Sequence, residues 1–195
     1  MRMILEHLNN YTVVLASKSP RRQELLKGMG VSFICQTKET PEQYPEMPFE
    51  EVPEYLSLQK SMAFDDEELP DRYLLITADT VVIACNEILG KPRDREDALR
   101  MMRLLSGKSH CVVTGVTVRS ARKTKSFSVK SKVTFARLDE EEMAYYIDTF
   151  KPYDKAGAYG IQEWIGYIGI SGLNGSFYNV MGLPTRRLYQ ILKNF

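Results

Sequence analysis

The feature that most constrains the fold is one long apolar stretch, Tyr73 to Cys85, which reads YLLITADTVVIAC. Its Ile, Val, Leu and Thr residues favour an extended strand, and Asp79 is its only charged residue. A carboxylate in such a stretch needs a cation, a metal or a proton to offset its lost solvation. The alternative is a strand-end aspartate satisfied by backbone amides. We therefore expect a buried strand that carries one candidate functional carboxylate.

The segments around this strand alternate between strand and helix patterns. Residues 11–16 predict a buried strand, and Ser19 and Pro20 then suit the N-cap and first position of a helix ending at Gly28 or Gly30. The acidic, Pro-rich segment 37–53 predicts a loop. Further strands are expected at 31–35, 111–118, 126–135 and 164–170, and further helices at 50–64, 94–107, 139–147 and from 184 onward. This mixture predicts an α/β fold with a mixed sheet, as a single domain over residues 1–195.

Charge and cysteine content argue against several classes of protein. The 26 basic and 25 acidic residues give a formal net charge of +1, so diffuse attraction to nucleic acid or anionic lipid is not expected. Cys35, Cys85 and Cys111 form no Cys-x-x-Cys pair, which disfavours a disulfide framework or structural zinc site and fits a reducing cytoplasm. Two histidines are too few for a multi-histidine metal site. The uncharged stretches are too short to span a membrane.

A candidate phosphate site lies at residues 17–22 (SKSPRR), between a predicted strand and helix. A helix N-terminus presents free backbone N–H groups and the positive end of the helix dipole, and both favour phosphate. Arg21 and Arg22 in the first turn oppose that dipole, and an anionic ligand would relieve the conflict. The alternative is that both arginines point into solvent or pair with Glu24 or a neighbouring lobe.

Two later residues are weaker candidates when each is taken alone. Lys91 lies in Gly90-Lys91-Pro92, where a turn lysine is the commoner interpretation. Gln162 closes the segment 151–162 and can both donate and accept hydrogen bonds, as reading a base edge requires. The alternative is an ordinary polar residue at the end of an element. The glycine-rich patterns of P-loop and dinucleotide-binding proteins do not occur.

Seven segments, taken in order, carry a shared pattern. They are LASKSPRRQELL (15–26), Glu39 with Lys60 downstream, TADTVV (77–82), ILGKP (88–92), LSGKSHCVVTG (105–115), KPYDKAGAYGIQ (151–162) and NVMGLP (179–184). Together they resemble the Maf (septum formation inhibitor-like) family of nucleoside triphosphate pyrophosphatases over nearly the whole chain. The chain departs from that pattern at three places, with Lys38 where Asp often precedes the Glu, Ser61 where Ala is common, and Glu163-Trp164 where glycine usually follows the Gln.

The resemblance implies a strongly twisted mixed sheet flanked by helices, with two lobes around a cleft as in inosine triphosphate pyrophosphatases. The implied reaction is hydrolysis of a nucleoside triphosphate to the monophosphate and pyrophosphate, with Mg²⁺ or Mn²⁺. The pattern of Arg21, Thr80 and Gln162 is similar to the branch that acts on dTTP and UTP, including modified pyrimidine nucleotides. The resemblance further implies a cytoplasmic house-cleaning enzyme, often dimeric.

The resemblance also implies a role for each candidate residue. Asp79 matches the general base, and Asp79 and Glu39 would hold the metal. Thr80 and Gln162 would select the base. The remaining positions match phosphate or substrate contacts: Ser17, Arg21, Arg22, Lys60 and Lys91.

Two alternatives remain open from the sequence. The first is a Maf-type pyrophosphatase of another specificity, for 7-methyl-GTP or CTP. The second is a regulatory septation inhibitor that arrests division by binding a partner. The near-neutral charge argues against a nucleic-acid partner, and the full set of catalytic groups argues against a pure binder.

Overall fold

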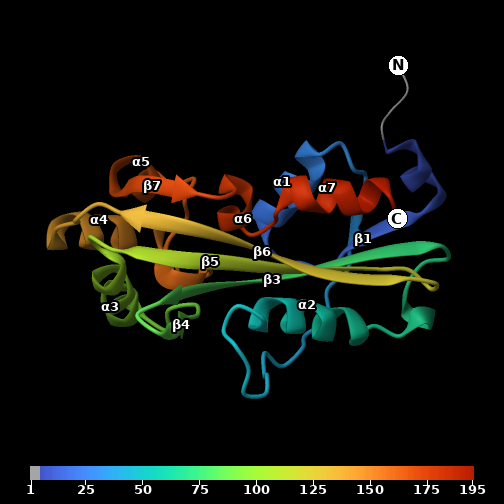
Figure 1. The fold of residues 1–195 in the computed structure, drawn as a ribbon, viewed down its shortest axis with the longest axis horizontal. Helices are drawn as coiled ribbons and strands as arrows, with labels where there is room; N and C mark the ends of the chain where they lie inside the picture. Colours follow the sequence, from blue (N-terminus) through green and yellow to red (C-terminus); the bar gives the residue numbers. More distant parts are fainter. Residues whose placement is uncertain (1–4) are drawn as a thin grey trace. The chain divides into compact units, whose positions relative to one another are not determined.

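The computed structural model describes residues 5–195 and contains a seven-stranded mixed sheet with helices packed on it (Figure 1). The strand order is β2-β1-β3-β5-β6-β7, and β4 pairs with β3. The strands are β1 (Thr12–Leu15), β2 (Ile34–Cys35), β3 (Tyr73–Ala84), β4 (Glu87–Leu89), β5 (Ser109–Arg119), β6 (Thr124–Phe135) and β7 (Ile170–Asn174). Both parallel and antiparallel pairs occur, so the predicted α/β class with a mixed sheet is confirmed.

Seven α-helices and three 3₁₀ helices (η) are assigned within residues 5–195. They are η1 (Glu6–Asn10), α1 (Pro20–Gly28), α2 (Val52–Met62), η2 (Asp66–Glu68), α3 (Arg95–Leu105), α4 (Glu140–Phe150), η3 (Ala156–Ala158), α5 (Trp164–Gly169), α6 (Phe177–Met181) and α7 (Thr185–Lys193). Within the described part of the chain, none of these helices has the length and apolar character that crossing a membrane requires.

The chain forms two compact units. The first contains the residues up to Asp79 together with Thr114–Val129 and Gly182–Phe195, and the second contains Thr80–Val113 and Lys130–Met181. The boundary therefore falls within β3, between Asp79 and Thr80.

In the first unit, β1 pairs in parallel with both β2 and β3, and Leu15 lies opposite Ile76. Helix α2 covers one face of these strands, and α1 and α7 cover the other (Figure 1). Parallel strands place their carboxyl ends at the same edge of a sheet, where ligands of α/β proteins commonly bind. The loop that follows β1 therefore lies beside the part of β3 that carries Asp79.

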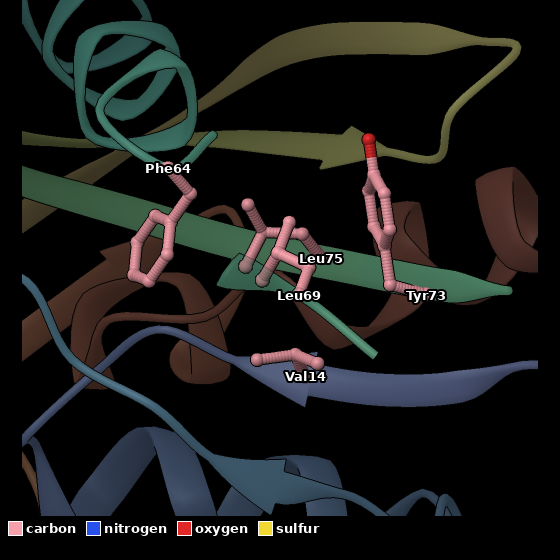
Figure 2. Close-up of a cluster of buried hydrophobic side chains, with 5 residues drawn as sticks. All are labelled: Val14, Phe64, Leu69, Tyr73 and Leu75. Carbon is pink, nitrogen blue, oxygen red and sulfur yellow. The ribbon is translucent and has the colours of Figure 1, made fainter. Parts of the chain in front are cut away.

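A cluster of buried apolar side chains joins these elements (Figure 2). It consists of Val14 from β1, Tyr73 and Leu75 from β3, Phe64 from the segment after α2, and Leu69 from the segment after η2. All five are at most 8% exposed. Their burial removes apolar surface from water on both β1 and β3 and so stabilises the pairing of these two strands.

Helix α2 is held against the sheet by close packing and by hydrogen bonds. A Cβ added at Gly115 of β5 would lie 2.2 Å from the Pro53 carbonyl oxygen, so only glycine allows this approach. The Thr77 hydroxyl donates to the Ser57 carbonyl at 2.6 Å, and the hydroxyls of Ser57 and Thr117 are 2.9 Å apart. These contacts fix the position of Lys60, which lies one turn further along α2.

The second unit is built on the β3–β4 hairpin, in which Val82 lies opposite Leu89, and on the antiparallel pair of β6 and β7. Helices α3 and α4 pack together, and bidentate pairs join Arg95 to Asp148 and Arg103 to Glu140. These exposed pairs link the two helices, and each adds little stability.

Most of the predicted elements are present, and one prediction is wrong. Residues 164–170 were expected to form a strand, but Trp164–Gly169 is the helix α5, and β7 begins only at Ile170. Ile165 and Gly169, four residues apart, are buried on one face of this helix. A Cβ at Gly166 would lie 1.8 Å from the Ile161 carbonyl oxygen. The close approach of the preceding chain therefore favours a helix in a segment whose composition favours a strand.

Candidate active site

The loop between β1 and α1 is ordered by its own side chains. The Ser19 hydroxyl accepts the Arg22 N–H as an N-cap, and Pro20 occupies the first turn, which confirms the predicted helix start. The buried Ser17 hydroxyl accepts the Ser19 N–H at 3.2 Å. The Gln23 amide donates to the Ser17 carbonyl at 3.3 Å. No acidic residue lies in the first turn of α1, so this helix end keeps its attraction for an anion.

Of the two arginines in that first turn, Arg22 lies in the electrostatic field of Asp79. The Arg22 side chain donates from Nε to the Gly182 carbonyl at 2.8 Å, a contact within the first unit. Burial lowers the pKa of the Arg22 guanidinium, Asp79 and Glu42 oppose this change, and the charge of Arg21 adds to it. Two cations at one helix start thus repel each other while Asp79 attracts Arg22, and an added polyanion would relieve that repulsion.

Asp79 is buried at 8% exposure and is bonded to Lys60. The same Lys60 ammonium donates to Glu42 at 2.9 Å, so one lysine from α2 bridges two carboxylates. Burial is the largest cause that raises the pKa of Asp79, and Glu42 adds to the rise, while Lys60 and Arg22 act in the opposite direction. A carboxylate with a raised pKa is a stronger base than an ordinary aspartate once it is ionised.

The structure brings Glu42, rather than Glu39, to this group. The side chain of Glu39 is 94% exposed, and its carboxylate lies 3.4 Å from the Lys18 ammonium. The neighbouring Lys38 pairs with Glu68 at 2.6 Å. The resemblance pointed to Glu39 as the second acidic residue of the site, and that role stays a prediction, while the structure shows Glu42 of the same loop at Lys60. The available signal was weak, because several glutamates occur in this loop.

The donor set around Asp79 suits a metal ion that arrives with phosphate oxygens. Among residues 5–195 no three His, Cys, Asp or Glu side chains gather closely enough to form a metal cage. Asp79 and Glu42 do share one cation, Lys60. Mg²⁺ is commonly bound by one or two carboxylates together with substrate phosphates and waters. The two carboxylates therefore fit the protein's share of such a site.

In the second unit, Thr80 and Lys91 lie on and after the β3–β4 hairpin. Thr80 directly follows Asp79 and is half-buried, and Lys91 is exposed just beyond β4. The carbonyl of Gly90 accepts the Gly157 N–H at 3.0 Å. Gly157 has a φ of +70°, and a Cβ there would lie 2.9 Å from a methyl group of Val82. The chain before Lys91 is thus held against the loop that leads to Gln162.

Gln162 lies in a loop of the second unit that is held by the buried Lys155 and by Tyr146. Lys155, which is 8% exposed, is 2.8 Å from Asp154 and 3.0 Å from Glu163. The buried Tyr146 hydroxyl donates to Glu163 and accepts the Gly160 N–H at 2.9 Å. The Gln162 side-chain oxygen is buried and has no hydrogen-bond partner among the described residues. An unsatisfied buried acceptor is costly, so this oxygen is suited to receive a donor from a ligand.

Comparison with known proteins gives full-length relatives. A family model described as "Maf-like protein" matches residues 12–195. The dTTP/UTP pyrophosphatase of Porphyromonas gingivalis is 53% identical over 197 residues, covering 98% of each chain. The protein of the same name from Bacteroides thetaiotaomicron is 50% identical and covers 97% of this chain and 99% of its own. That from Parabacteroides distasonis is also 50% identical and covers 98% of this chain and 100% of its own.

One solved structure is similar at much lower identity. It is the nucleoside-triphosphatase / dITP/XTP pyrophosphatase of Mycobacterium abscessus, which is 14% identical to this chain. The superposition covers 94% of this chain and 97% of that chain, with a TM-score of 0.44. That overlap is too loose to bear on fold or function. The family model and the full-length relatives need no such support, and they show that this chain belongs to the Maf family.

Proposed function

We propose that the protein is a nucleoside triphosphate pyrophosphatase that converts dTTP and UTP to the monophosphate and pyrophosphate. The observation that carries the proposal is the buried Asp79 carboxylate, bonded to Lys60 and lying in the field of Arg22 at the start of α1. Full-length relatives named dTTP/UTP pyrophosphatases, 50–53% identical to this chain, support the substrate class.

In this proposal Asp79 is the general base. It accepts a proton from a water molecule whose oxygen attacks the α-phosphorus, and the bond between the α-phosphorus and the bridging oxygen breaks. Pyrophosphate leaves with that oxygen, so one triphosphate and one water yield one monophosphate and one pyrophosphate. General-base catalysis of this kind contributes roughly 10²–10⁴-fold to the rate.

The cations bind the phosphates and stabilise the charge that develops on the leaving group. Arg21 and Arg22 approach from the first turn of α1, where backbone N–H groups add to the attraction. Lys60 bridges Asp79 and Glu42 in the ligand-free protein, and Lys91 adds a further point charge. Ser17 orders the loop that precedes α1 and its arginines through its bond to Ser19.

Mg²⁺ or Mn²⁺ is the proposed cofactor, held by Asp79 and Glu42 together with the phosphates. Such an ion neutralises phosphate charge and acidifies a bound water. We assign the second carboxylate to Glu42 because it shares Lys60 with Asp79. Glu39, predicted from the resemblance, is the less favoured ligand because it is exposed and paired with Lys18.

Gln162 is the proposed reader of the base, with Thr80 as a second selecting residue. Uracil and thymine present one N–H donor between two carbonyl acceptors. The buried, unpartnered Gln162 oxygen can accept from that N–H, while the amide NH₂ can donate to a carbonyl. Cytosine has an acceptor in place of the N–H, so it would leave the Gln162 oxygen unsatisfied.

A substrate panel with product identification tests the proposal. The purified protein is assayed with dTTP, UTP, CTP, GTP and 7-methyl-GTP, in Mg²⁺ and in Mn²⁺, and the nucleotide and phosphate products are separated. We expect monophosphate and pyrophosphate, with the highest kcat/KM for dTTP and UTP. Preference for CTP or 7-methyl-GTP would contradict the specificity. Release of a diphosphate and orthophosphate, or no hydrolysis at all, would contradict the reaction.

A further inference from the structure

Glu163 stands at the N-cap of α5 but does not cap it. No side-chain hydrogen bond from Glu163 reaches the first turn of that helix. Its carboxylate is used elsewhere, because one oxygen accepts the Tyr146 hydroxyl and the other lies 3.0 Å from the Lys155 ammonium. A glutamate whose carboxylate bonds side chains from α4 and the 151–162 segment ties the loop to both of them.

The partners of Glu163 are buried, which strengthens these bonds because little water competes for them. Tyr146 is fully buried and Lys155 is 8% exposed. Burial and the neighbouring Glu163 raise the pKa of Tyr146, so its hydroxyl stays protonated and continues to donate. Removing one partner of a buried, hydrogen-bonded charge leaves the others without compensation. The Glu163 carboxylate is therefore held in one position.

The Gln162 amide and the Glu163 carboxylate both lie against Gly160. A Cβ at Gly160 would lie 2.9 Å from the Gln162 amide nitrogen and 2.9 Å from the Glu163 carboxyl carbon. The Gly160 N–H is itself bonded to the Tyr146 hydroxyl. The Gln162 amide thus touches a backbone segment whose position is set by Tyr146 and Glu163, while its own oxygen is without a partner among residues 5–195.

We propose that Glu163 is a positioning residue that, through Tyr146 and Lys155, holds the Gln162 amide in one orientation and so sharpens nucleobase selection. The inference rests on the proposed function and adds to it a residue that does not touch the substrate. Glycine at this position could make neither bond. Glu163 therefore affects how well uracil is told from cytosine, and affects the hydrolytic step much less.

The test uses two variants that each remove one bond with little change in shape, Glu163→Gln and Tyr146→Phe. The ratio of kcat/KM for UTP to that for CTP is measured, together with thermal unfolding. We expect each variant to lower this ratio by about tenfold, which corresponds to the net contribution of about one hydrogen bond, with kcat for UTP within about twofold of wild type. Glu141→Gln, an exposed glutamate on α4, is the matched control and should keep the wild-type ratio.

A double-variant comparison separates positioning from a purely structural role. If Glu163 acts through Gln162, then Glu163→Gln should change the UTP/CTP ratio in the wild-type background and leave it unchanged in a Gln162→Ala background. A structural effect would lower activity or unfolding temperature alike in both backgrounds. Binding of UMP and CMP gives a readout independent of turnover. Trp164, the only tryptophan of the chain, follows Glu163 and reports that binding by fluorescence.

The possible failures are distinguishable. A wild-type protein that neither hydrolyses dTTP or UTP nor prefers UMP to CMP overturns the proposed function and this inference with it. A wild-type protein with the expected preference, whose Glu163→Gln and Tyr146→Phe variants keep the full UTP/CTP and UMP/CMP ratios, overturns the inference alone. So does an equal loss of discrimination in the Gln162→Ala background.

Discussion

Arg21 belongs to the first turn of α1, where its charge acts on that of Arg22. If it binds a phosphate oxygen, Arg21→Ala should raise KM for dTTP and UTP by roughly tenfold, the value of one charge-assisted hydrogen bond. Steady-state kinetics measures this change, with a smaller effect expected on kcat. Arg186→Ala, an exposed arginine of α7, is the control. An unchanged KM in Arg21→Ala would remove this residue from the phosphate site.

His110 gives a prediction for stability against pH. It is buried, bonded to the Tyr159 hydroxyl at 2.7 Å, and stacked on Phe135. Burial lowers its pKa to about 4, whereas the pKa of a histidine in an unfolded chain is about 6.5. The unfolded chain therefore binds a proton first as pH falls. The stability that neutral His110 contributes is complete above about pH 6.5 and is lost towards pH 4, at up to about 1.4 kcal/mol per pH unit.

Urea unfolding between pH 4 and pH 7.5 checks this prediction. The free energy of unfolding of the wild type should fall more steeply below pH 6.5 than that of His110→Gln, which has no titrating ring and can still meet the Tyr159 hydroxyl. Carboxylates elsewhere titrate alike in both proteins and cancel in the comparison. Parallel pH profiles would show that burial does not lower the pKa of His110 in the folded protein.

Single residues were predictable from the sequence where they broke a pattern. Asp79 stood out because it is a charge within an apolar strand, and the structure shows Lys60 as its cation. Glu42 could not be chosen over Glu39, because both lie in one acidic loop and no periodicity ranks them. Their difference is tertiary: Glu42 meets Lys60 from α2, while Glu39 meets Lys18.

At the scale of elements, the position of α2 decides where Lys60 lies. Gly115 of β5 allows the start of α2 to approach, since a Cβ there would be 2.2 Å from the Pro53 carbonyl oxygen. Gly115→Ala should therefore push α2 away and cost about 1–3 kcal/mol, as overpacking does. It should also lower kcat/KM for UTP, because Lys60 moves away from Asp79.

Urea unfolding and steady-state kinetics measure these two effects together. Gly28→Ala, at the end of α1, is the matched control, because a Cβ at Gly28 meets no atom within 4 Å. Wild-type stability and turnover in Gly115→Ala would mean that α2 does not depend on this close contact.

Elements with local signals were predicted well, and those fixed by packing were not. The start of α1 is encoded by Ser19 and Pro20, which cap a helix in any context. Helix α5 depends instead on tertiary packing. Ile165 is buried, and the Ile161 carbonyl oxygen approaches Gly166 so closely that no Cβ would fit there. Its run of aromatic and aliphatic residues has strand-like propensity, and tertiary contacts overrode that propensity.

At the scale of the whole molecule, family membership follows from matches spread over nearly all of the chain, and the α/β fold is seen in its mixed sheet and helices. Seven ordered segments made the family visible in the sequence. What they left open is whether the molecule acts as an enzyme or only binds a partner, and that question depends on one carboxylate.

The most direct measurement is therefore the single-turnover hydrolysis of UTP by Asp79→Asn, made alongside the Kd for UTP. Asp71→Asn, an exposed aspartate of the first unit, is the control. We predict a Kd within a few-fold of wild type and a rate lowered by roughly 10²-fold or more, since the general base is lost. Hydrolysis by Asp79→Asn at close to the wild-type rate would contradict the account.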